Sequence, residues 1–99
     1  MIISGNFETR EVLINGKLLD PGPSQKVWNH SPNGFLWGYE SSGPAQLALA
    51  ILLLVTDKET AVLCHQEFKR QVIAKLPRRD FSIDISMTFW IDKLKAESV

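Results

Sequence analysis

The stretch GYESSGPAQLALAILLLV, residues 38–55, joins a turn rich in glycine and serine to the most apolar run in the chain. Serine hydroxyls commonly cap helix N-termini, and a proline in the first helical turn costs no hydrogen bond. Ser41 or Ser42, followed by Pro44, therefore predicts a helix over about residues 44–56. Because this helix is apolar on nearly all sides, we expect it to be buried between a sheet and another helix.

Two functional interpretations of the same stretch fail on its residues. Gly38 and Gly43 have the spacing of the two glycines in a phosphate-binding P-loop. However, Pro44 stands where such a loop needs lysine, and Ala45 where it needs serine or threonine; a weaker anion site at the free amides of the helix start is left open. The apolar run, residues 47–55, is far shorter than the roughly 20 residues that cross a bilayer, so no membrane contact is expected.

A β-hairpin is predicted on the N-terminal side of this helix. Asn15-Gly16 is the strongest two-residue hairpin signal, because both positions of a type I′ turn favour positive φ. A two-residue loop pairs Ile14 with Lys17, and the proline- and glycine-rich residues 20–23 end the second strand.

The segment between the hairpin and the long helix is rich in aromatic residues. Residues 31–34 read Ser-Pro-Asn-Gly, which suits a type I turn. Residues 27–28 and 35–39 are expected to be short extended pieces on either side of this turn.

A second helix is predicted over about residues 58–76, with Asp57 as its N-cap. One side of it carries apolar residues at helical spacing, which is typical of a surface helix with one buried face. This stripe consists of Ala61, Cys64, Phe68, Val72 and Leu76. Residues 81–85 alternate like a half-buried strand, and Ser86 or Asp84 is placed to cap a short last helix.

Together these elements predict an α+β fold in a single domain, residues 1–99. A small antiparallel β-sheet, made of the N-terminal hairpin and one or two later strands, packs on two main α-helices, with a short C-terminal helix. Gln46 interrupts the apolar face of the first long helix. Since a buried amide must be hydrogen-bonded, we expect its side chain to bind the turn at residues 29–31.

Charge and cysteine content narrow the function classes. The chain has 11 basic and 11 acidic residues and a net charge of zero, so binding to nucleic acid requires a local patch. Cys64 is the single cysteine, which rules out an internal disulfide and is compatible with a reducing compartment. One cysteine and two histidines are too few to supply the four cysteine and histidine ligands of a structural zinc site. No metal or cofactor is expected. Residues 1–10 lack the segments of a signal peptide, so a cytoplasmic location is predicted.

Three residues near the turn suggest catalysis. His30, Glu40 and Ser42 are the types used as base, orienting acid and nucleophile, which must lie within hydrogen-bond reach. Cys64 and His65 are a weaker pair, because adjacent residues on a helix point about 100° apart. A small hydrolase or transferase around His30 and Ser42 is one hypothesis, with a histidine bonded to a turn carbonyl as the structural alternative.

Aromatic side chains gather between residues 28 and 39. Loops that carry several large aromatics are places where interfaces and hot spots form, although core packing accounts for such residues equally well. The predicted surface for a protein partner consists of Trp28, His30, Phe35, Trp37 and Tyr39.

Basic residues gather at the end of the second helix. Cations there complement the helix dipole, which explains part of the cluster. The functional interpretation is a patch that contacts the phosphates of a nucleic acid. Its members are Lys69, Arg70, Lys75, Arg78 and Arg79.

The segment NHSPNGFLWGYESSGPAQLALAILL, residues 29–53, resembles the signature of an uncharacterised family of small bacterial, phage and plasmid proteins, a domain of unknown function. The family pattern is roughly NHSPxGFxWGYxGSGPAQLALAIL, and Ser41 replaces one of its glycines. The resemblance extends over residues 6–94 and implies no activity, cofactor or catalytic residue. It points first to His30, Ser31, Trp37, Gly38, Tyr39, Gly43, Pro44 and Gln46, either as a site or as a structural turn and helix cap.

The resemblance implies a setting of phages and mobile elements, where small proteins often bind a host protein or nucleic acid. We therefore expect a non-enzymatic binding protein of phage or mobile-element type that acts on a protein partner through the aromatic loop. Nucleic-acid binding through the basic patch is the alternative, and an enzyme around His30 and Ser42 is the third hypothesis. A homodimer is left open.

Overall fold

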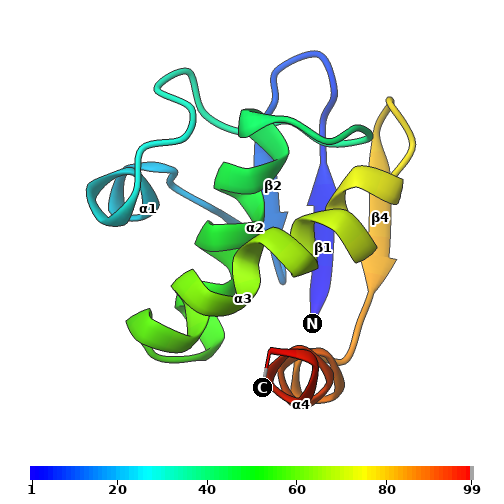
Figure 1. Ribbon diagram of the computed structural model, residues 1–99. Helices are drawn as coiled ribbons and strands as arrows, with labels where there is room; N and C mark the ends of the chain where they lie inside the picture. The colour runs from blue at the N-terminus through cyan, green and yellow to red at the C-terminus, as the bar shows by residue number, and fades with distance from the viewer. Residues whose placement is uncertain (99) are drawn as a thin grey trace.

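A four-stranded antiparallel sheet and the helices that cover it make up the protein, for which a computed structural model describes residues 1–98 (Figure 1). The elements in chain order are β1 (Ile2–Gly5), β2 (Val12–Ile14), β3 (Lys17–Leu18), α1 (Gly22–Val27), α2 (Ser42–Val55), α3 (Lys58–Gln71), the 3₁₀ helix η1 (Ile73–Lys75), β4 (Phe81–Asp84) and α4 (Met87–Glu97). The predicted α+β class, with its small antiparallel sheet and C-terminal helix, is confirmed.

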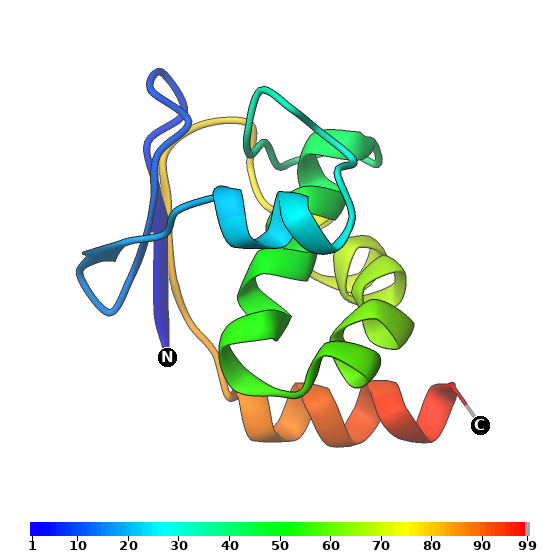
Figure 2. The same ribbon diagram turned by 90° about the vertical axis from the view of Figure 1, so that its left-hand side faces the viewer.

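The sheet has the strand order β3-β2-β1-β4, so the N-terminal strand β1 lies between the hairpin and the late strand β4. Ile3 pairs with Ile14 on one side and with Ile83 on the other, which places these three side chains on one face. Ile3 is fully buried. Figure 2 shows all the helices on one side of the sheet, and this isoleucine face is the one that they cover.

The predicted hairpin is confirmed, but the strand before it was missed. Ile14 pairs with Lys17, and Asn15 and Gly16 have φ of 49° and 84°, as the turn requires. Strand β1 was not predicted because Ile2 and Ile3 are adjacent apolar residues, without the alternation typical of a half-buried strand.

The segment after the hairpin differs from the prediction. Residues 22–27 form the helix α1 where a turn and an extended Val27 were expected. A proline in the first turn starts this helix, and the hydroxyl of Ser24 donates to the carbonyl oxygen of Pro21 over 2.7 Å. The turn at residues 31–34 is confirmed by a 3.2 Å hydrogen bond from Gly34 N–H to the Ser31 carbonyl. Residues 35–39 form no strand.

Helix α2 is the centre of the core, and residues 43–52 within it are all buried. Ser41 is the N-cap residue by position, although its side chain makes no capping hydrogen bond. Asp57 caps α3 as predicted, accepting from the Thr60 N–H over 3.0 Å. The predicted second helix is shorter than expected, because the backbone at Val72 leaves the helical region and only the turn η1 follows.

Helix α4 runs below the sheet and the other helices in Figure 2, and the Ser86 hydroxyl caps it by accepting from the Phe89 N–H. Within residues 1–98 no helix combines the length and the apolar character that a membrane span requires.

Gly5 is the position in β1 where the core comes closest to the backbone. A Cβ added there would lie 2.5 Å from a ring carbon of Phe81 and 2.8 Å from a ring carbon of Trp37. Because both rings are buried, we expect Gly5→Ala to lower the free energy of unfolding by about 1–3 kcal/mol, measured by urea denaturation. Ser4→Ala, on the opposite face of the strand, is the matched control and should change it by less than about 0.5 kcal/mol. Equal effects of the two substitutions would contradict this packing.

Candidate functional site

The side chain of Gln46, fully buried in α2, organises the segment that follows α1. Its Oε1 accepts from the backbone N–H groups of His30 and Ser31 over 2.7 and 2.9 Å. Its Nε2 donates to the Ser24 hydroxyl over 2.9 Å and to the Trp28 carbonyl oxygen over 3.1 Å. The expected bond between this amide and the turn at residues 29–31 is therefore confirmed, and the amide has all of its ordinary partners.

The ring of His30 is held against a second histidine. Its Nε2 lies 2.9 Å from Nε2 of His65, a fully buried residue of α3. The Nδ1 of His65 lies 2.7 Å from the carbonyl oxygen of Val62. Because a carbonyl only accepts, His65 carries its proton on Nδ1, and in the neutral pair its Nε2 accepts from Nε2–H of His30.

Burial lowers the pKa of both histidines from the ordinary value of 6.5. For His30, the charge that His65 and Lys69 place nearby lowers the pKa further. For His65, the backbone carbonyls of Val62 and Ala61 oppose this effect but do not overcome it. The pair is therefore neutral at pH 7, and protonation of either ring lowers the free energy of unfolding.

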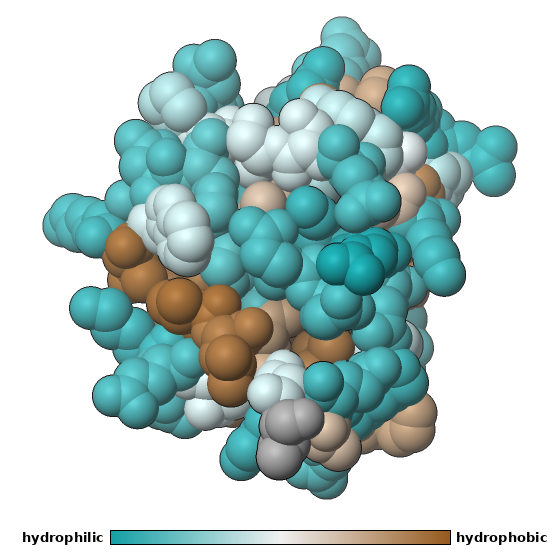
Figure 3. Space-filling model, in the orientation of Figure 1, coloured by the Kyte–Doolittle hydropathy of each residue, from teal (hydrophilic) through white to brown (hydrophobic). Residues whose placement is uncertain are grey.

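Trp28 covers the histidine pair and remains 49% exposed. Its indole stacks on the His30 ring with centroids 4.5 Å apart and planes inclined by 23°, and it meets the His65 ring edge-on at 5.5 Å. Figure 3 shows a hydrophobic band across the region where Figure 1 places α1 and the first half of α3. Leu63 of α3 is 62% exposed.

Only part of the predicted aromatic surface is exposed in the structure. Phe35 and Trp37 are 5% and 0% exposed, so the expectation that they face a partner is corrected. Trp37 packs against the rings of Phe7 and Phe81, and its indole N–H donates to the Arg79 carbonyl over 3.0 Å. These contacts come from distant segments, which local sequence does not reveal.

Tyr39 is half-buried, and the guanidinium of Arg78 lies 4.9 Å from its ring centre. The five predicted residues are therefore divided between the core and the surface. Trp28 and His30 stay together on one exposed face.

The predicted basic patch is partly engaged within the protein. Arg70 forms a 2.9 Å ion pair with Glu67 and lies 3.9 Å from Glu40. Arg78 donates to the Gly38 carbonyl over 3.2 Å, and Lys69 is half-buried. Lys75 and Arg79 are exposed, and their side chains form neither an ion pair nor a hydrogen bond with residues 1–98.

The predicted catalytic group is not assembled by hydrogen bonds. His30 uses Nε2 for the contact with His65, and Glu40 lies near Arg70. Ser42 is exposed, and within residues 1–98 no hydrogen bond joins it to His30 or Glu40. In the same part of the chain, no group of three or more histidine, cysteine or acidic residues is placed to hold a metal ion.

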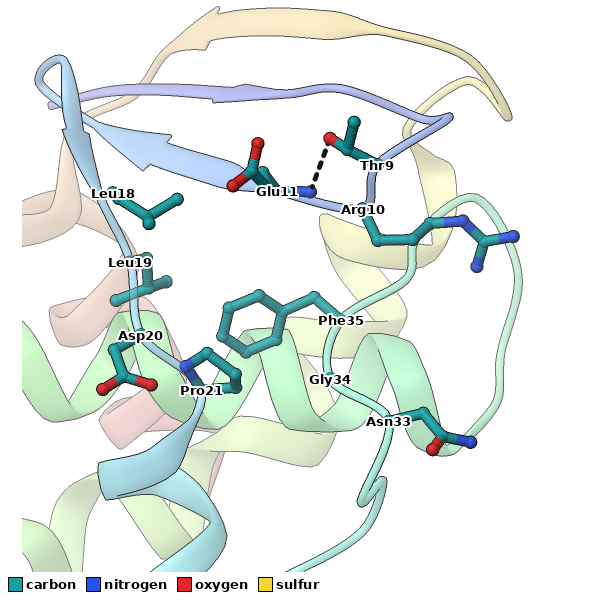
Figure 4. A pocket seen from close by; sticks show the side chains of 10 residues that line it. All are labelled: Thr9, Arg10, Glu11, Leu18, Leu19, Asp20, Pro21, Asn33, Gly34 and Phe35. Atoms are coloured by element: carbon teal, nitrogen blue, oxygen red, sulfur yellow. Dashed lines mark hydrogen bonds between the residues drawn. The ribbon is translucent and has the colours of Figure 1, made fainter.

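A pocket of about 370 Å³ opens between the hairpin and the turn that carries Phe35. Residues 9–11, 18–21 and 33–35 line it, as Figure 4 shows. The floor is apolar and the rim carries charged groups. Sequence patterns do not indicate this pocket, because three separate segments form it.

Comparison with known proteins gives one match. A model of a family of unknown function, DUF6166, matches residues 4–92. The chain belongs to the DUF6166 family. No curated protein and no solved structure matches it.

His65 is the residue of this DUF6166 protein that pattern reasoning passed over. It was assessed only with its neighbour Cys64, whereas its position four residues after Ala61 and three before Phe68 places it beside the apolar stripe. A polar residue beside a buried stripe needs a partner inside the protein, as Gln46 does. The same rule applied to His65 would have pointed to a buried contact.

Replacing Gln46 tests whether its side chain holds the Trp28–Ser31 segment. Gln46→Leu keeps the volume but leaves the Ser31 N–H without its acceptor and leaves the His30 N–H only the Trp28 carbonyl oxygen, at 3.1 Å. We expect the free energy of unfolding to fall by about 2–4 kcal/mol in urea denaturation. Gln66→Leu, at an exposed position of α3, is the control and should change little. A Gln46→Leu protein as stable as this control would refute the organising role.

The histidine pair makes stability depend on pH. Both pKa values are lower in the folded protein than in the unfolded chain, so below about pH 6.5 the unfolded chain binds more protons. The free energy of unfolding should therefore be highest above that pH and fall from about pH 7.5 to about pH 5.5, a range in which carboxylates stay ionised. His65→Gln removes one titrating ring, and its urea-unfolding free energy should vary less with pH. An unchanged slope in this variant would contradict the assignment.

Proposed function

We propose that this DUF6166 protein is a non-enzymatic binding module that recognises a protein partner through a surface centred on Trp28. The observation that carries the proposal is the half-exposed indole, which is stacked on His30 and held edge-on by His65. Tryptophan is enriched among hot-spot residues of interfaces. An indole that is already fixed in the free protein loses little conformational freedom when a partner covers it.

Exposed side chains of α3, the helix that carries His65 beneath Trp28, support a protein partner. Leu63 exposes most of its side chain, and together with Val62, Lys58 and Glu59 it lines a shallow hollow of about 520 Å³ on α3. One lysine and one glutamate beside apolar side chains match the composition of an interface, in which a hydrophobic centre is surrounded by polar groups.

The proposal includes a cytoplasmic setting and an origin in bacteria, phages or plasmids. The resemblance of residues 29–53 supports that origin, and the single, buried cysteine is compatible with a reducing compartment. Action on a partner by binding alone fits the use of His30 in the pair with His65, which leaves its Nε2 engaged.

Trp28→Ala tests the proposed surface against a matched variant. Phe89→Ala is the control, because Phe89 of α4 is also a large exposed aromatic, at 58%. Tagged wild-type protein and both variants are used to capture partners from nuclease-treated lysate of the source cell, followed by quantitative mass spectrometry. We expect one defined protein to be retained by the wild type and by Phe89→Ala. Its affinity for Trp28→Ala should be roughly 30-fold lower, the equivalent of about 2 kcal/mol.

Circular dichroism and thermal unfolding of the three proteins separate lost binding from lost folding. Capture that is equal for Trp28→Ala and Phe89→Ala would overturn the Trp28 surface. The alternative outcome is a partner captured only from lysate without nuclease treatment, and not by a variant carrying Lys75→Ser and Arg79→Ser. That result would favour nucleic acid as the ligand.

A further inference from the structure

We propose that the pocket formed by residues 9–11, 18–21 and 33–35 binds a primary ammonium group carried on a short aliphatic stem. This ligand site is separate from the Trp28 surface and does not depend on the function proposed for it. The volume of about 370 Å³ lies in the range of small-molecule sites, which have apolar walls and a few polar groups that orient the ligand.

The floor of the pocket suits the stem. Phe35 is almost fully buried and its ring points toward Leu19 and Pro21 in Figure 4, so its position is fixed by the core. Leu18, the last residue of β3, is 61% exposed and adds an apolar wall. An aliphatic chain placed between Phe35 and Leu18 would bury apolar surface of both.

The rim of the pocket suits the ammonium. Glu11 and Asp20 stand at two sides of the opening in Figure 4, and neither carboxylate forms an ion pair with residues 1–98. Asp20 uses Oδ1 to accept from the Gly22 N–H over 2.9 Å, which fixes its position. Two carboxylates at an apolar opening favour a cation with an apolar stem and disfavour an anion.

Arg10, the cation that also lines the pocket, is directed away from it. Its backbone has a φ of 67°, and its Nε donates to the Phe7 carbonyl over 2.9 Å. The guanidinium carbon lies 5.2 Å from the centre of the Phe7 ring, and Figure 4 shows the side chain extending to the far side from Phe35. The charge at the opening is therefore negative and comes from Glu11 and Asp20.

The recognised chemistry has two natural sources. One is a lysine side chain in a peptide, and the other is a free aliphatic amine. Both present an ammonium at the end of a chain of several methylene groups. The charge at the opening and the apolar floor suit both ligands equally. The probe that tests the shared chemistry is hexylammonium, compared with hexanoate and 1-hexanol, which have the same stem and a different head.

The experiment follows the backbone amide signals of Gly34 and Leu19 by two-dimensional NMR while each probe is added to the ¹⁵N-labelled protein. We expect saturable shifts with hexylammonium and affinities several-fold weaker for hexanol and hexanoate. Glu11→Gln should lower the affinity for hexylammonium by about 3- to 10-fold and leave that for hexanol unchanged. Leu18→Ala, at an exposed position, should weaken both probes.

Glu8→Gln is the matched control, because Glu8 is exposed in the same loop and does not line the pocket. Hexanoate or hexanol binding as tightly as hexylammonium would overturn the proposal. The absence of saturable shifts would overturn it as well, as would equal effects of Glu8→Gln and Glu11→Gln. Titration with N-acetyl-lysine methylamide and with cadaverine then identifies the source. Tighter binding of the first compound indicates a lysine side chain, and tighter binding of the second indicates a free amine.

Discussion

The hydrogen bonds of the buried Gln46 side chain hold α1 and residues 28–31 in place. Gln46 lies in the helix that forms the centre of the core, where an unpaired amide would be costly. Its four partners come from α1 and from the segment just after it. The amide therefore joins the most apolar helix to the most irregular part of the chain. The position of Trp28 and His30 follows from that connection, and so does the contact of His30 with His65.

On the sheet side, the packing of aromatic rings has the corresponding role. Trp37 lies between Phe7 and Phe81 and covers β1 at Gly5, where there is room for an indole only because the strand carries no Cβ. The Trp37 indole N–H is bonded to the backbone just before β4. The residues from 35 to 37 thus cover one end of the sheet, and the pocket that Phe35 lines is formed at the place where this segment meets the hairpin.

Local rules were sufficient where a structure depends on neighbouring residues. Asn15-Gly16 predicted the hairpin and its register, and Asp57 predicted the start of α3, because turns and caps are decided within a few residues. The partners of Gln46 followed from the rule that a buried amide must be bonded. The strand β1 lacked alternation, and α1, a helix of 6 residues, was too short to show a period. The burial of Trp37 depends on rings that are distant in the sequence, so no local pattern predicts it.

Several residues between positions 29 and 53 serve mainly to build the fold. Gln46 binds the loop, Trp37 covers the sheet, and Gly43 lets α2 approach Leu36, where an added Cβ would lie 2.7 Å from the Leu36 Cβ. These contacts give all three residues a structural role. Trp28, just before this segment, remains accessible, and so does the pocket that residues 33–35 complete with residues from the hairpin. The binding proposed for this protein is therefore expected to depend on Trp28 and on this pocket, while the buried contacts of Gln46, Trp37 and Gly43 set their geometry.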